Sequence, residues 1–267
     1  MLSNMSVDQA LIKARSHVKK NEIKAARDLY KSVLLSFPKN IRAQEGLAAL
    51  GEYPRDNSKD NPPENIINQL IRLYKEGHLF ILAEKAQALS KQYPKSFEVW
   101  NILGGANIGL GKVRQAVANF TNVIKLNPNY AYAYINLGVA LHAQGKLDEA
   151  SQAYLKAISL KPKNAVIYYN LGNTLKKQGN LNEAIKVYNK ALSLNPNYAA
   201  VYNNVGNIFE EQVKLNKAIE SYKKALSIKP NYAEALNNIA NILKKQGKLE
   251  LAIETYKKAL SIKPDYA

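Results

Sequence analysis

The sequence YINLGVALHAQGKLDEASQAYLKAISLKP, at residues 134–162, decides the fold of this chain. Moved forward by 34 residues, it lies on YYNLGNTLKKQGNLNEAIKVYNKALSLNP at residues 168–196, with both glycines and the final proline in register. Residues 100–128, 202–230 and 236–264 follow the same pattern. A fixed period of roughly 20 to 50 residues is typical of a solenoid, in which copies of one unit stack on their neighbours.

Each unit is predicted to form two helices joined by a tight turn. Gly138 has no side chain, so the first helix can approach the second closely, and Ala150 provides a matching small surface there. Tyr154 is expected to fill the space between the helices. Gly145 lies between them, where a left-handed residue commonly ends a helix. Pro162 ends the second helix, because the residue before a proline is pushed out of the α region.

The spacing divides the chain into an N-terminal piece and a main array. Residues 1–50 hold a divergent copy, with expected helices at 7–19 and 23–36. Residues 51–63 are rich in Pro, Asp and Asn and are predicted to be a linker. The array begins with a second divergent copy at 64–96. Five regular copies then fill residues 97–267, at 97–130, 131–164, 165–198, 199–232 and 233–266.

The repeat resembles the tetratricopeptide repeat, whose pattern is an aromatic residue, Leu-Gly, a later Ala-x3-aromatic and then Pro. The markers of the second regular copy are Tyr134, Leu137, Gly138, Ala150, Tyr154 and Pro162. The same markers recur in the other regular copies, although Leu236, Ile239 and Ala240 weaken the start of the last one. The resemblance implies an all-α fold, an α-α superhelix of about seven helical hairpins, similar to bacterial tetratricopeptide arrays.

One copy departs from the pattern at its inter-helix turn. Val213 occupies the position that Gly145 and Gly179 hold in the two preceding copies. A β-branched residue is unfavourable at positive φ, and Lys217 opposes the dipole of the helix that follows. We therefore expect residues 210–218 to be a local weak point, or to adopt another turn conformation.

Composition excludes several classes of protein. The absence of cysteine excludes disulfides and cysteine metal sites. No leader-like apolar run occupies the first twenty residues, and no stretch approaches the length of a membrane span. We expect a cytoplasmic protein. The formal charge of +17 favours acidic partners, although most lysines are expected to lie on a solvated helix surface.

The sequence shows no catalytic pattern, and we expect no enzymatic activity, cofactor or metal site. His17, His78 and His142 fall at unrelated positions of the repeat, so they are not expected to share a site. Gly111 and Lys112 look briefly like a phosphate-binding loop, but neither the preceding glycine nor the following Ser or Thr of that motif is present.

Asparagines recur on one face of the first helix of successive copies. They are Asn136, Asn170, Asn173, Asn204, Asn207, Asn238 and Asn241. An asparagine amide both donates and accepts, so a stack of them could hold an extended peptide by its backbone. The arrangement resembles the asparagine ladder in the superhelix of O-linked N-acetylglucosamine transferase. The alternative is that the asparagines tie one repeat to the next.

Charged pairs flank these asparagines near the end of the first helices. The pairs are Lys176 with Lys177, Glu210 with Glu211, and Lys244 with Lys245. We expect some residues of each pair to border the same groove. Other lysines cluster late in the second helices, where they complement the helix dipole and are expected to face outward.

The favoured function is a protein-interaction scaffold that binds a peptide or extended segment in the concave groove. One alternative is the substrate-recruiting region of a larger enzyme, with a sulfotransferase, glycosyltransferase or methyltransferase domain beyond residue 267. Another is a basic solenoid that binds RNA or a different polyanion. Nucleic acid is not the expected partner of the groove, because its positions lack base-stacking aromatics. Self-association is expected through apolar residues of the last helix, such as Ile253, Tyr256 and Leu260.

Overall fold

The computed structural model describes residues 5–50 and 60–265, in which every regular element is an α-helix. The all-α solenoid fold expected from the repeat is therefore present. The chain divides into two compact units, Met1–Asn61 and Pro62–Ala267. Most of the predicted linker lies outside the described residues.

The N-terminal unit contains α1 (Val7–Lys19), α2 (Ile23–Ser36) and α3 (Ile41–Ala49). The bounds of α1 and α2 agree with the expected ones. Ser6 caps α1, because its hydroxyl accepts the Gln9 backbone N–H while the Gln9 side chain accepts the Ser6 N–H. Tyr30 is buried among small residues of all three helices, which gives this unit a core of its own.

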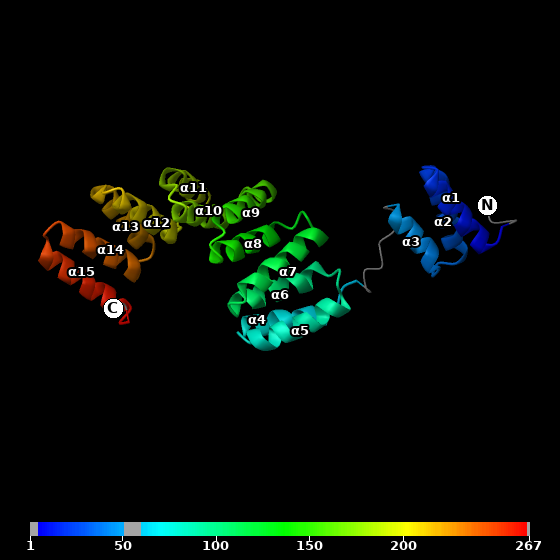
Figure 1. The fold of residues 1–267 in the computed structure, drawn as a ribbon, viewed down its shortest axis with the longest axis horizontal. Coiled ribbons are helices and arrows are strands. Elements are labelled where there is room, and N and C mark those ends of the chain that lie inside the picture. The colour runs from blue at the N-terminus through cyan, green and yellow to red at the C-terminus, as the bar shows by residue number, and fades with distance from the viewer. Residues whose placement is uncertain (1–4, 51–59, 266–267) are drawn as a thin grey trace. The chain divides into compact units, whose positions relative to one another are not determined.

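The main unit is a series of six antiparallel hairpins (Figure 1). The first hairpin pairs α4 (Glu64–Lys75) with α5 (Leu79–Gln92). The other five are α6 (Phe97–Gly109) with α7 (Val113–Leu126), α8 (Ala131–Ala143) with α9 (Leu147–Leu160), α10 (Ala165–Lys177) with α11 (Leu181–Leu194), α12 (Ala199–Glu211) with α13 (Leu215–Ile228), and α14 (Ala233–Lys245) with α15 (Leu249–Ile262). In Figure 1 they follow one another from α4 in cyan to α15 in red.

In four of the five regular hairpins, a glycine of the first helix lies against an aromatic ring of the second helix. A Cβ atom on Gly172 would lie 2.4 Å from Cε1 of Tyr188, a ring that is completely buried. The first helix can therefore rest directly on the ring. The same relation joins Gly104 to Phe120, Gly138 to Tyr154, and Gly206 to Tyr222. The close approach expected from the sequence is thus present, and the aromatic ring is its partner.

The turn at Val213 keeps the geometry of the glycine turns. Val213 has a φ of 59°, and Gly179, at the same place in the preceding hairpin, has a φ of 79°. The Val213 N–H donates to the Glu210 carbonyl at 2.9 Å, as the Gly179 N–H does to the carbonyl of Lys176 at 2.9 Å. A β-branched residue therefore occupies the left-handed region, which carries strain. The other conformation considered for this turn is not the one observed.

The first helices of the hairpins lie on the inner side of the main unit. Along the series α6, α8, α10, α12 and α14, each helix contacts the next. Within the described residues, the second helices α7, α9, α11, α13 and α15 have no such contacts with one another. A stack curves towards the side on which its helices are closer, so the first helices line the concave face. The predicted site residues belong to these helices.

Candidate binding groove

The asparagines of the concave face bond to one another across the hairpins. Asn204 of α12 donates its Nδ2 to Oδ1 of Asn173 in α10 at 2.7 Å. The same Oδ1 accepts the Tyr188 hydroxyl of α11 at 2.6 Å. One amide oxygen thus joins three helices from two hairpins. We call such a group, two asparagines with one tyrosine hydroxyl, a rung.

The next hairpin repeats this rung. Asn238 donates to Asn207 Oδ1 at 3.0 Å, and the Tyr222 hydroxyl donates to the same oxygen at 2.8 Å. Two neighbours extend the network, since Asn238 also donates to Asn203 at 3.3 Å and the Tyr256 hydroxyl donates to Asn241 at 2.5 Å. The hydrogen bonds themselves tie repeat to repeat, as the alternative interpretation of the asparagines expects.

The rungs engage the side-chain oxygens of two asparagines but leave hydrogens on their amide nitrogens. The Oδ1 atoms of Asn173 and Asn207 each receive two hydrogen bonds within the protein. Their Nδ2 groups donate to no other side chain in the described part of the chain, and an amide nitrogen carries two hydrogens. These two asparagines therefore retain N–H donors, whereas their oxygens are engaged within the protein. Sequence reasoning missed the tyrosine hydroxyls, because the Ala-x3-aromatic marker suggested a packing role alone.

At the N-terminal side of the rungs, the asparagines pair differently. Asn136 donates to Asn101 Oδ1 at 3.2 Å, so this pair joins α8 to α6. Val139 stands in α8 at the place that Asn173 occupies in α10. A hollow of about 120 Å³ opens there. Its lining residues are Val139, His142, Tyr154, Asn170 and Asn173.

The predicted charged pairs form ion pairs between hairpins. Lys176 lies 3.5 Å from Glu211, and Lys245 lies 2.7 Å from Glu210. These pairs are partly exposed, so each contributes roughly 1 kcal/mol or less. Lys177 and Lys244 make no ion pair within the described residues.

Two larger hollows lie beside these charged residues. One, of about 440 Å³, is lined by His142, Asn173, Lys176, Lys177, Asn204 and Glu211. The other, of about 460 Å³, is lined by Glu210, Asn241, Lys244 and Lys245. Part of the predicted set therefore borders open space, namely Asn170, Asn173, Asn204, Asn241, Lys176, Lys177, Glu210, Lys244 and Lys245. Asn136, Asn207 and Asn238 line none of these three hollows.

His142 is held in one tautomer by Thr174. The Thr174 hydroxyl donates to the Asn170 carbonyl at 2.9 Å, and His142 Nδ1 lies 2.9 Å from the same hydroxyl oxygen. A hydroxyl has one hydrogen, so Nδ1 must be the donor in this contact. Burial, with a smaller contribution from the Lys177 charge, lowers the pKa of the His142 imidazole. The ring is therefore neutral at pH 7, with Nε2 free to accept.

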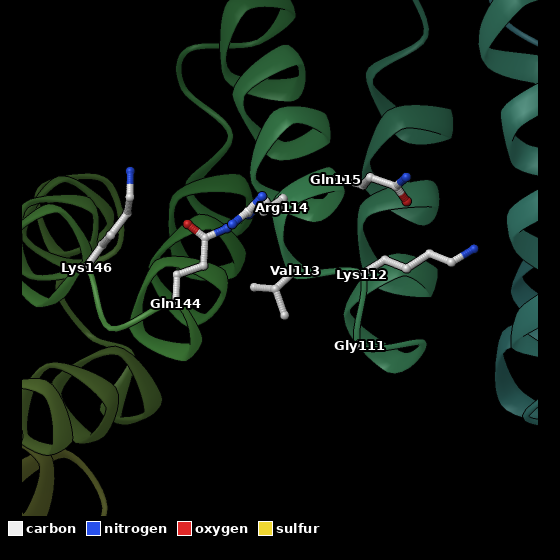
Figure 2. A pocket seen from close by; sticks show the side chains of 7 residues that line it. All are labelled: Gly111, Lys112, Val113, Arg114, Gln115, Gln144 and Lys146. Atoms are coloured by element: carbon white, nitrogen blue, oxygen red, sulfur yellow. The ribbon is translucent and has the colours of Figure 1, made fainter.

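A separate basic cluster lies at the turns of the first two regular hairpins (Figure 2). The hollow there, of about 650 Å³, is lined by Gly111, Lys112, Val113, Arg114, Gln115, Gln144 and Lys146. Lys112 and Lys146 extend in different directions, and Arg114 reaches towards Gln144 (Figure 2). Lys146 also lies 3.3 Å from Glu149. The cations are thus spread along the rim and do not converge on one point.

The described residues offer neither a metal-binding cluster nor a membrane-spanning helix. Across residues 5–50 and 60–265, no group of three or more His, Asp or Glu side chains is placed to hold a metal ion. No helix in that part of the chain is both long enough and apolar enough to cross a membrane.

Comparison with protein families gives matches over the regular repeats. A family model described as the TPR repeat matches residues 108–145, 140–179, 172–213 and 214–247. A second, described as the tetratricopeptide repeat, matches residues 233–266. Together the matches span more than half of the chain. No curated protein matches the sequence.

Several solved structures share the fold. The crystal structure of MamA has a TM-score of 0.55 and 28% identity, over 61% of this chain and 95% of MamA. PilF of Pseudomonas aeruginosa has a TM-score of 0.65 and 17% identity, over 76% of this chain and 92% of PilF. YrrB, described as a TPR protein with an unusual peptide-binding site, has a TM-score of 0.53 and 21% identity, over 69% and 95% of the two chains. The likenesses to PilF and YrrB concern the fold alone.

Proposed function

The chain belongs to the tetratricopeptide repeat family, a family of scaffolds for protein–protein interaction, and we propose that its main unit holds an extended peptide segment in the concave groove. The observation that carries this proposal is a set of three hollows lined by residues of α8, α10, α12 and α14, among them four of the predicted asparagines and the four predicted lysines. The peptide-binding site described for YrrB, which shares this fold, supports the same use of the repeat.

The groove would select its ligand through an excess of donors. The Asn173 and Asn207 amides keep N–H groups, because their oxygens are engaged within the rungs. Lys177 and Lys244 add positive charge beside them. An extended peptide presents its backbone carbonyls to such a surface, and acidic side chains would add to the attraction. Affinity would be moderate, because ordering a flexible segment offsets part of the contact energy.

The experiment that tests this proposal changes the free lysines and keeps the asparagines. Peptides selected against the wild-type chain from a random display library would be measured on the double variant Lys177→Glu with Lys244→Glu. The matched control is Lys190→Glu with Lys223→Glu, which makes the same charge change on exposed residues of α11 and α13. We expect binding to weaken about tenfold or more in the groove variant alone. Equal binding by both variants, or no selected peptide at all, contradicts the groove function.

A polyanion-binding role is the second candidate, and the basic cluster at the hairpin turns favours it. Binding to heparin through Lys112, Arg114 and Lys146 would fall steeply with salt, because each contact releases counterions. A triple change of these residues to Gln would then remove the binding. Salt-independent affinity would count against this role. The recruiting role for a catalytic domain beyond residue 267 stays a hypothesis.

Self-association would use the outer face of α15. Ile253 is 54% exposed and Leu260 is 44% exposed. Tyr256, also expected on this face, is half-buried, and its hydroxyl donates to Asn241. Light scattering over a range of concentrations tests the idea, with Ile253→Asp as the variant that should remain monomeric. A wild-type chain that stays monomeric at high concentration contradicts it.

A further inference from the structure

The ladder of rungs is interrupted at Val139, which leaves a gap where an accepting asparagine would stand. In the two following hairpins, the asparagine at this position accepts a tyrosine hydroxyl and the amide of the next hairpin. Val139 cannot accept either bond. Tyr154 and Asn170, which stand where the two donors stand in a complete rung, are therefore left without that oxygen.

Both donors remain unpaired and face the hollow. Tyr154 is only 2% exposed, and its hydroxyl makes no hydrogen bond within the described residues. The Asn170 side chain likewise makes none there, although its backbone carbonyl accepts the Thr174 hydroxyl. The Tyr154 hydroxyl oxygen is not fully enclosed, because it borders the hollow, where solvent or a ligand can reach it. A ligand that supplies an oxygen here gains hydrogen bonds that these two side chains do not make within the described residues.

The hollow has room for a small polar group. Its volume is about 120 Å³, compared with roughly 30 Å³ for one water in the liquid. Among its lining residues, Tyr154, Asn170 and Asn173 present hydrogens, and none is a carboxylate. Asn173 belongs to this set because its own oxygen is already engaged by Tyr188 and Asn204.

The charges nearby are mostly positive. Lys176 and Lys177 line the adjoining hollow, and Glu211 in that hollow is paired with Lys176. His142 borders both hollows and keeps its Nδ1 hydrogen on Thr174. Burial raises the pKa of the Tyr154 hydroxyl, so this group remains a donor at neutral pH. Several donors with a nearby cation suit an oxygen that has several lone pairs and a negative charge.

We propose that the hollow beside Val139 is a carboxylate subsite of the peptide groove, in which an acidic side chain of the bound segment supplies the oxygen that an asparagine would supply in a complete rung. This inference rests on the proposed function. The carboxylate belongs to a side chain and not to the end of the peptide. Rungs and amide pairs lie on both sides of the gap, at Asn101 with Asn136 and at Asn173 with Asn204, so the bound segment continues in both directions.

Two variants distinguish an effect on the subsite from an effect on the stability of the fold. Val139→Asn should complete the rung, and the protein should become more stable while the subsite closes. Tyr154→Phe removes a hydroxyl that bonds to none of the described residues, so stability should hardly change. The matched control is Tyr222→Phe, which removes a hydroxyl that donates to Asn207. The control should lower stability and leave the subsite intact.

The probe is sodium acetate. Its binding is monitored by the NMR chemical shifts of the Asn170 side-chain amide and the His142 ring. Acetamide and sodium chloride at equal concentration and ionic strength are the comparison solutes. In the wild type and in Tyr222→Phe, acetate alone should shift both signals. Tyr154→Phe should weaken the response about tenfold, as expected for losing one hydrogen bond to a charged group. Val139→Asn should abolish it.

Three results would overturn the proposal. They are no response of the wild type to acetate, an equal response of Val139→Asn, or an equal response of the wild type to acetamide. The titration needs no peptide, so its outcome does not depend on the groove function. Peptides with an acetylated N-terminus and an amidated C-terminus then test the source of the carboxylate. Because their terminal carboxylate is blocked, an internal Asp or Glu must be enough for binding at the subsite. Peptides that bind equally to the wild type and Val139→Asn would refute the subsite while the groove function stands.

Discussion

The strained turn at Val213 allows a quantitative test of the repeat geometry. Val213 has a φ of 59°, and its side chain is 78% exposed. A left-handed conformation costs an L-residue roughly 1–2 kcal/mol, with β-branched residues at the upper end. Replacing Val213 with glycine releases this strain. The glycine loses about 0.5–1 kcal/mol through the greater freedom of the unfolded chain, and the lost packing is small because the side chain is so exposed. The net expectation is a stabilisation of about 1 kcal/mol.

The measurement is urea unfolding followed by circular dichroism and by the fluorescence of Trp100, the only tryptophan. Trp100 lies in α6 and Val213 follows α12, so agreement between the probes shows that the array unfolds as one unit. A gain of 1 kcal/mol corresponds to a rise of about 2–4 °C in Tm for a unit of this size.

The matched control is Gly179→Val, the reverse change at the same turn of the preceding hairpin. No atom lies within 4 Å of a Cβ placed on Gly179, so the whole effect comes from the backbone. This variant should lose about the same free energy of unfolding. If Val213→Gly is neutral or destabilising while Gly179→Val is tolerated, strain at positive φ does not explain the behaviour of these turns.

Three further changes test the packing, the groove and the N-terminal unit. Gly172→Ala should lower the free energy of unfolding by about 1–3 kcal/mol, because its Cβ would overlap the buried Tyr188 ring; unchanged urea unfolding would contradict this. The pKa of His142, followed by NMR, should lie below 6.5 and rise in Lys177→Ala. Because only the unfolded chain is protonated between that lowered pKa and 6.5, His142 should reduce stability as the pH falls through this range. Ser6→Ala should destabilise the N-terminal unit by about 1 kcal/mol, as seen by hydrogen exchange in α1, since it removes the capping box; unaltered protection of α1 would refute the cap.

Sequence reasoning succeeded where the governing forces act within one hairpin. The spacing of Gly138, Ala150 and Tyr154 predicted the close helix pair, and the position that Val213 shares with the turn glycines marked it as an unfavourable residue, although the sequence left its conformation open. Both depend on backbone sterics and on the contacts of neighbouring helices. The predicted site residues follow from the same periodicity, but the partners of their side chains do not.

By itself, the sequence determined the α-helical period, the hairpins and the face that carries the asparagines, because helix geometry relates residues a few positions apart. Only the tertiary structure decided what those asparagines bond to. Asn204 reaches Asn173, 31 residues earlier, whereas Asn136 reaches Asn101, 35 residues earlier. Asn238 makes both bonds, to Asn207 and Asn203, so both positions of the preceding hairpin lie within reach. That reach depends on the rotation and distance between successive hairpins, which arise from packing across the whole stack. The hollow at Val139 has the same origin, because a single missing oxygen matters only where stacking brings two donors from different hairpins to one point.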